Sequence, residues 1–145
     1  MLIYTDGCCY NHGNQNKRKK SAYAFVAIHE RNIVHTQAEK VEEEDILRIE
    51  LIGILKALQY YDTQYCNLDE NNNMCIIKTD SQIAVNSFLG NINRNKHRDI
   101  WDQIEDICYK YMGKIRVYHV EGHSTDKMNK YADKLAKIEA RKLIG

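Results

Sequence analysis

The spacing of apolar residues along the chain changes from a strand-like pattern to a helical repeat. Residues 2–9 (LIYTDGCC), 21–30 (SAYAFVAIHE) and 32–41 (NIVHTQAEKV) are rich in β-branched and aromatic residues, which predicts three successive strands. The second and third strands are joined at Glu30-Arg31-Asn32, which suits a tight hairpin. The chain is therefore expected to begin with an antiparallel meander.

From Leu47 onward the apolar residues recur at helical spacing. Leu47, Leu51, Ile54 and Leu58 fall on one face of an amphipathic helix of about four turns. The remaining patterns predict, in order, a strand at 74–80, helices at 81–89 and 98–112, a strand at 114–120 and a helix at 127–143. The order βββαβααβα predicts an α/β fold with a mixed sheet, in which the later strands pair in parallel.

Length and composition favour a single domain covering residues 1–145, with 43% hydrophobic and 28% charged residues. We expect no membrane partner, since no apolar run approaches the roughly 20 residues that a span requires. No export signal is recognised at the N-terminus. An odd number of cysteines with no Cys-x-x-Cys pair argues against a disulfide framework and a zinc cage, and predicts a reducing, cytoplasmic location.

The net charge of +1 does not by itself indicate a nucleic-acid partner. A basic run, Lys17 to Lys20, and an acidic run, Glu42 to Asp45, are each interpreted as solvated loops, although the basic run could also form a binding patch. We expect a monomer.

Four carboxylates stand on or beside apolar segments. Asp6 and Asp80 each follow a threonine at the end of an apolar strand, the edge at which open α/β folds place their ligands. Glu50 lies between Ile49 and Leu51, and Asp133 lies close to the buried face of the last helix. An isolated Asp-Gly often only begins a turn, and Glu50 or Asp133 could be boundary residues that lean into water. The matching positions of Asp6 and Asp80 favour a shared site.

A cluster of carboxylates is stable at neutral pH only when cations neutralise its repulsion. Carboxylates without thiolate or imidazole partners favour Mg²⁺ or Mn²⁺ over zinc. Two such ions about 4 Å apart would activate a water and stabilise the leaving oxygen in phosphodiester hydrolysis. The acids are therefore interpreted as metal ligands.

Five motifs occur in the order typical of one family: YTDG (4–7), RIELIGILKAL (48–58), TDSQ (79–82), EGHS (121–124) and YADKLA (131–136). In these motifs the chain resembles ribonuclease H, type 1, over essentially its whole length. The resemblance implies a ribonuclease H-like fold with a five-stranded mixed sheet. It also implies an endonuclease that hydrolyses the RNA strand of an RNA–DNA hybrid, leaving a 5′-phosphate and a 3′-hydroxyl.

The resemblance also implies roles for individual residues. His123 matches a mobile-loop histidine that assists proton transfer or product release, and the alternative is a solvent-facing histidine in a flexible turn. A zinc pair of His119 with His123 is discounted, because a strand meets a loop there and no helix aligns the two rings. The metal ligands, for two Mg²⁺ or Mn²⁺ ions with substrate, would be Asp6, Glu50, Asp80 and Asp133.

The chain departs from the family where the hybrid is held. The family usually has a threonine and two asparagines before the helical glutamate, and here Asp45, Ile46 and Leu47 stand there. Ile46 and Leu47 cannot hydrogen-bond a 2′-hydroxyl, and Asp45 would repel a phosphate. We therefore expect weak hybrid affinity, in part offset by the basic run. Substrate contacts are expected from Gly7, Cys8, Arg48, Ser81 and Gln82.

Three other functions stay open on the sequence alone. A nuclease of the same superfold could act on DNA, since fold does not determine substrate. A hybrid-binding module could have lost turnover, but a binder gains nothing from repelling acids. A signalling domain with Asp6 or Asp80 as phosphate acceptor is disfavoured by the antiparallel start. The vicinal Cys8 and Cys9 are interpreted as strand packing.

Overall fold

The computed structural model describes residues 1–10, 20–90, 94–122 and 126–142. The strands are β1 (Leu2–Tyr10), β2 (Lys20–His29), β3 (Asn32–Val41), β4 (Cys75–Thr79) and β5 (Ile115–His119). The α-helices are α1 (Ile46–Gln64), α2 (Gln82–Phe88), α3 (Arg98–Lys110) and α4 (Lys127–Arg141). Short 3-10 turns at Tyr65–Asn67 and Asn95–His97 complete the described elements.

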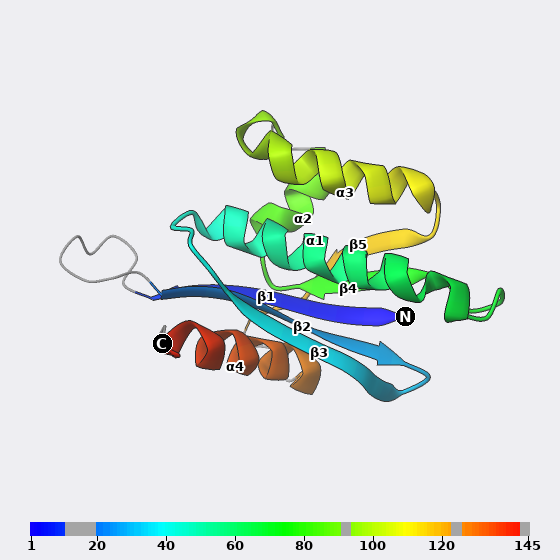
Figure 1. Ribbon diagram of the computed structural model, residues 1–145, viewed down its shortest axis with the longest axis horizontal. Helices are drawn as coiled ribbons and strands as arrows, with labels where there is room; N and C mark the ends of the chain where they lie inside the picture. Colours follow the sequence, from blue (N-terminus) through cyan, green and yellow to red (C-terminus); the bar gives the residue numbers. More distant parts are fainter. Residues whose placement is uncertain (11–19, 91–93, 123–125, 143–145) are drawn as a thin grey trace.

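The five strands form one mixed sheet in the order β3-β2-β1-β4-β5 (Figure 1). β1 pairs with β2, and β2 with β3, in antiparallel register, whereas β4 pairs in parallel with both β1 and β5. Glu30 and Arg31 form the two-residue hairpin turn and both have positive φ, the backbone that matches the twist of the flanking strands. The predicted α/β class, mixed sheet and element order are confirmed.

Helices cover the two faces of the sheet unequally (Figure 1). α1 and α2 pack on one face, and α3 packs against α1. The larger apolar core lies between this face and these helices and includes Ile3, Phe25, Leu51, Ile77 and Trp101. On the opposite face α4 packs on β1, β2 and β3, around a smaller cluster that contains Tyr4, Val26 and Ala132.

The first helix is held at its N-terminus by a side chain that the sequence analysis had interpreted as part of a solvated acidic run. Asp45 is the N-cap of α1, where its carboxylate accepts hydrogen bonds from the amides of Leu47 and Arg48. α1 has 19 residues, about one turn more than predicted. The added residues are covered by α3 and by the Tyr61, Tyr65 and Tyr111 aromatic cluster.

β1 runs to Tyr10, one residue past the predicted range 2–9, and Asp6 lies inside it, so the placement of Asp6 at the end of the strand is wrong. The antiparallel pairing with β2 extends over the whole of β1, whereas the parallel pairing with β4 ends at Thr5 and Thr79. Asp6 therefore still pairs with β2 but lies one residue beyond the last pair of the β1–β4 ladder. This position leaves the β4 side of Asp6 open to other groups.

β1 and α1 approach closely where Asp6 and Glu50 face each other. A Cβ at Gly7 would lie 2.8 Å from Cγ2 of Ile49 and 3.3 Å from Cδ of Glu50. No side chain fits at such a distance without a shift of the helix. Gly7 therefore sets the separation between strand and helix, and with it the distance between the two carboxylates.

We expect Gly7→Ala to lower the free energy of unfolding by about 1–3 kcal/mol, since the added methyl group must displace α1. Urea denaturation monitored by circular dichroism measures the change. Ile49→Ala, which removes the clashing methyl group, is the matched variant. The double variant should lose less stability than the two single losses added together. Strict additivity would show that the contact between Gly7 and Ile49 is not the cause.

Candidate active site

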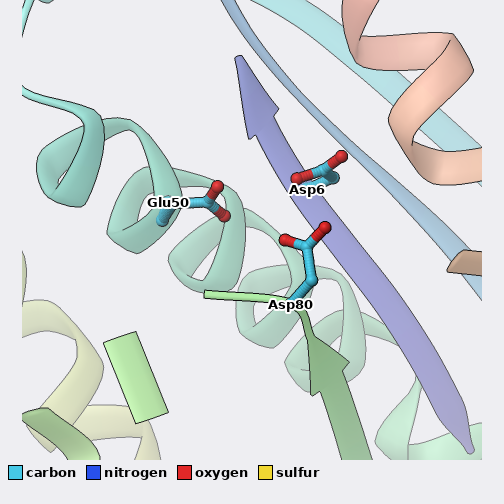
Figure 2. A group of neighbouring side chains, drawn as sticks. All are labelled: Asp6, Glu50 and Asp80. Carbon is cyan, nitrogen blue, oxygen red and sulfur yellow. The ribbon is translucent and has the colours of Figure 1, made fainter. Parts of the chain in front are cut away.

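Three acidic side chains from distant parts of the chain meet at one edge of the sheet. Asp6 comes from the middle of β1, Asp80 directly follows β4 and Glu50 projects from α1. Figure 2 shows the three carboxylates directed into one shared space. One oxygen of each carboxylate lies within 4.8 Å of the other two. The separation is short enough for a single cation to contact all three residues.

Sheet topology accounts for the meeting of Asp6 and Asp80. Thr5 and Thr79 are the last residue pair of the parallel β1–β4 ladder, so the next residue on each strand emerges at the same level. Thr79 Oγ1 accepts a hydrogen bond from the amide of Ser81 at 3.1 Å, and Ser81 Oγ caps α2 through the amide of Ala84. These bonds hold the backbone on both sides of Asp80.

The carboxylates of Asp6 and Glu50 are buried, with 3% and 5% of the residue exposed. Burial raises the pKa of Asp6, and the charges of Glu50 and Asp80 raise it further. Burial, followed by the charge of Asp80, raises the pKa of Glu50 from 4.5 to about 8, although the Gly7 amide acts in the opposite direction. Burial also raises the pKa of Asp80. Without a cation, the cluster is unfavourable to ionise.

Two buried oxygens in the cluster have no hydrogen-bond partner. Oδ2 of Asp6 and Oε2 of Glu50 are both unsatisfied, whereas Oδ1 of Asp6 accepts a hydrogen bond from the amide of Gly7 at 2.9 Å. Unpaired buried carboxylate oxygens cost free energy that a bound cation would recover. An all-oxygen donor set fits Mg²⁺ or Mn²⁺. The residues therefore fit a hard divalent cation.

Asp133 lies close to this group without joining it. Its charge raises the pKa of Asp6, Glu50 and Asp80, which places it beside the cluster. It lies outside the group of three whose oxygens are within 4.8 Å, and its carboxylate pairs with Lys137 of the next helical turn at 2.8 Å. Of the four predicted ligands, three converge and the fourth stands at the rim on α4.

His119 is the last residue of β5, and His123 follows it in the sequence. His123 lies outside the described residues, but Gly122 before it passes beside Asp80, since a Cβ there would be 3.6 Å from Asp80 Oδ2. His119 was discounted in the sequence analysis as a zinc ligand, and the structure places it near the carboxylates. It pairs in register with Thr79, and its charge acts to lower the pKa of Asp80. The parallel pairing of β4 with β5 would have placed His119 beside Thr79, and so near Asp80, already from the sequence.

The residues expected to contact substrate differ in their burial and in their hydrogen bonds. Gly7 and Cys8 follow Asp6 on β1, and the Cys8 thiol stays protonated because burial and the charge of Asp6 raise its pKa to about 11. Ser81 is the N-cap of α2, and Gln82 is exposed with its side-chain amide bonded to Asn86. Both lie at the cluster side of the sheet, next to Asp80 in the chain.

Arg48 is committed to a different interaction. Its guanidinium donates to Glu43 at 2.8 Å and forms a two-pronged ion pair with Asp99 at 3.0 and 2.5 Å. Asp45, expected to repel phosphate, is paired with Lys96 at 2.9 Å and with His97 at 3.5 Å. These pairs join the N-terminus of α1 to the start of α3. Arg48 and Lys96 are therefore each paired with acidic side chains of the protein itself.

The family model named RNase H matches residues 1–141. The chain belongs to the ribonuclease H family. This membership confirms the predicted family and the expectation of a ribonuclease H enzyme. The ribonuclease H of Acetivibrio thermocellus is 27% identical over 98% of this chain and 95% of its own length. The ribonuclease H of Syntrophomonas wolfei is 25% identical over 99% of this chain and 97% of its own length.

Solved structures confirm the ribonuclease H fold. LC11-RNase H1 in complex with an RNA/DNA hybrid superposes with a TM-score of 0.73, at 18% identity, over 94% of each chain. The foamy viral protease-reverse transcriptase, also in complex with an RNA/DNA hybrid, superposes with a TM-score of 0.76 at 22% identity. That match covers 98% of this chain and 20% of the viral chain. No helix in the described part of this ribonuclease H-family chain has the length and apolarity needed to span a membrane.

We expect Glu50→Gln to stabilise the metal-free protein at pH 8. The raised pKa of Glu50 means that the folded state holds the proton more tightly than the unfolded state, so wild-type stability falls as pH rises from about 4.5 toward about 8. The glutamine variant does not lose this stability. Its free energy of unfolding should exceed that of the wild type by about 1 kcal/mol or more at pH 8, and by less toward pH 5. Urea unfolding in EDTA at both pH values measures it.

Glu70→Gln, at an exposed turn position, is the matched control and should change little at either pH. Adding Mg²⁺ or Mn²⁺ at pH 8 should stabilise the wild type more than Glu50→Gln, because the ion binds the folded state. A wild type that is as stable at pH 8 as at pH 5 in EDTA would contradict the electrostatic description of the cluster.

Proposed function

We propose that this protein is a divalent-metal-dependent endonuclease that hydrolyses the RNA strand of RNA–DNA hybrids, leaving 5′-phosphate and 3′-hydroxyl ends. The observation that carries the proposal is the convergence of Asp6, Glu50 and Asp80 within 4.8 Å, with buried oxygens left unpaired. Membership in the ribonuclease H family supports the reaction class. The RNA/DNA hybrids bound in the two structural neighbours support the substrate class.

Asp6, Glu50, Asp80 and Asp133 would hold Mg²⁺ or Mn²⁺, with two ions present when substrate is bound. Such ions lower the pKa of a bound water and stabilise the charge that develops on the leaving oxygen. The chain itself supplies a rigid donor set on two strands and a helix. Asp133 is paired with Lys137 in a partly exposed ion pair, which costs little free energy to break. Its carboxylate would therefore be able to join the metal ligands when substrate binds.

Proton transfer at this site is assigned in the proposal to His123. The proximity to Asp80 of Gly122, the residue before His123 in the chain, supports it. An imidazole titrates near neutral pH and can accept or donate a proton in each turnover. His119, on the neighbouring strand end, is a second imidazole close to Asp80.

Recognition of the hybrid would rest on few groups. The amide of Gly7 and the thiol of Cys8 border the carboxylates, and Gln82 presents an exposed amide side chain at the start of α2. We do not include Arg48, because its guanidinium is held by Glu43 and Asp99. With Ile46 and Leu47 in place of hydrogen-bonding residues, preference for ribose would be weaker than in relatives that carry them.

Cleavage assays on labelled hybrid, RNA duplex, DNA duplex and single strands, with Mg²⁺, Mn²⁺ or EDTA, test the proposal. We expect hybrid-selective cutting that requires a divalent ion. Asp80→Asn should lower the rate at least about a hundredfold, because it removes a charge that holds the metal. Asp106→Asn, at an exposed position on α3, is the matched control and should keep full activity.

Two outcomes would overturn the proposal. Preferential cutting of a DNA duplex would show that the protein is a nuclease that acts on DNA. Tight hybrid binding without cleavage under either metal would assign the chain to the non-catalytic binding modules.

Ile46 offers a separate test of how the hybrid is recognised. It is the first residue of α1 and is 44% exposed, so its truncation perturbs little packing. We expect Ile46→Ala to leave the ratio of hybrid to DNA-duplex affinity within about twofold of the wild-type value, since an alkyl side chain cannot bond a 2′-hydroxyl. Fluorescence anisotropy measures both affinities. A selective loss of hybrid binding would contradict the expectation.

A further inference from the structure

Within the part of the chain that the structure describes, α4 leaves part of its side of the sheet uncovered. α4 packs on β1, β2 and β3, which leaves that face of β4 and β5 without a helix among the elements in contact. Ile115 and Val117 pack against the larger core, so Arg116 and Tyr118 project to the opposite face. Both side chains are exposed, Tyr118 by 51%. We name Lys78, Arg116 and Tyr118 the open face.

Strand register arranges these residues in rows. Tyr4, Lys78 and Tyr118 are direct neighbours across β1, β4 and β5, and Arg116 belongs to the adjacent row with Ile76. Lys78 Nζ lies 5.7 Å from the centre of the Tyr4 ring, and the Tyr4 hydroxyl donates to Asp126 at 2.7 Å. Tyr4 is therefore buried, whereas Tyr118 is exposed, with Lys78 as its neighbour on β4 and Arg116 two residues before it on β5.

The open face continues directly into the carboxylate cluster. Asp6 lies two residues beyond Tyr4, and Asp80 lies two residues beyond Lys78. Because alternate residues of a strand share a face, the row of Lys78 and Tyr118 stands one pleat from these two acids, about 7 Å along the strands. A polymer bound at the carboxylates meets this row as its next contact.

The chemistry of the open face matches a single strand of nucleic acid. An exposed tyrosine ring stacks on an unpaired base, whereas the bases of a duplex already stack on one another. Lys78 and Arg116 complement phosphates, and the Arg116 guanidinium donates to the carbonyl of the preceding residue. Asp126, the nearby acid, is held by Tyr4 and by the N-terminus of α4.

We propose that the open face binds the single-stranded continuation of the RNA strand, with Tyr118 stacked on a base and Lys78 and Arg116 on its phosphates. The inference rests on the proposed function, because the RNA strand is the strand that the carboxylates would engage. The protein would then hold hybrids that end in a single-stranded RNA tail more tightly than blunt hybrids.

Fluorescence anisotropy in EDTA, where nothing is cut, tests this inference on a blunt hybrid and on hybrids with a tail of about six nucleotides. The tail is RNA or DNA, at either end of its strand. We expect an RNA tail at one end to strengthen binding about tenfold, since one stacked base and its phosphates contribute on that scale. Tyr118→Ala should abolish the gain, Arg116→Ala should reduce it and Tyr118→Phe should keep it. Tyr109→Ala, at an exposed tyrosine on α3, is the matched control and should also keep it.

The outcomes separate this inference from the proposed function. Loss of the tail effect in Tyr118→Ala, with blunt-hybrid cleavage in Mg²⁺ unchanged, supports the open face. No tail effect, or one that survives Tyr118→Ala, overturns it even when the wild type cleaves hybrids. A Tyr118-dependent gain from a DNA tail overturns the assignment to RNA. Failure of the proposed function would instead appear as absent cleavage of the blunt hybrid.

Discussion

The mutual repulsion of three carboxylates at the end of the β1–β4 ladder is the constraint on which the rest of this structure depends. Asp6 and Glu50 are almost fully buried, and burial raises the pKa of both. The charge of Glu50 raises the pKa of Asp6 further, and the charge of Asp80 raises the pKa of both acids. Nothing in apolar packing favours such an arrangement. The fold must therefore supply enough stability elsewhere to hold the acids together, as expected for a functional site.

The two-layer packing supplies that stability and also sets the geometry. The larger core ties α1 to β1 through residues such as Ile3 and Leu51, and Gly7 permits the close approach that brings Glu50 to Asp6. Asp45 caps the start of the same helix, and Arg48 anchors it to α3 through Asp99. The polar groups before Glu50 thus fix the helix within the protein.

Much of the fold follows from the sequence, because apolar periodicity reports burial directly. The element order and the mixed sheet were predicted, and helix ends differed by a few residues where caps and tertiary contacts decide. That the β1–β4 ladder stops before Asp6 while the β1–β2 ladder continues was not predicted, since residue alternation does not show where a second ladder stops. Matching strand-end positions predicted a shared site for Asp6 and Asp80, whereas Glu50 and Asp133 were assigned to it from their apolar surroundings and from the family resemblance. The structure groups Glu50 with the first two and leaves Asp133 outside that group. His119 and the ion pairs of Arg48 were missed, because both depend on which distant elements become neighbours.

Isothermal titration calorimetry of the metal-free protein with Mn²⁺ at pH 7, in two buffers of different ionisation enthalpy, tests the central claim most directly. We expect Mn²⁺ to bind with release of protons, because carboxyls of raised pKa must lose them to ligate a cation. Asp6→Asn should weaken binding and release fewer protons. Absence of any binding heat, with and without a hybrid present, would contradict the account.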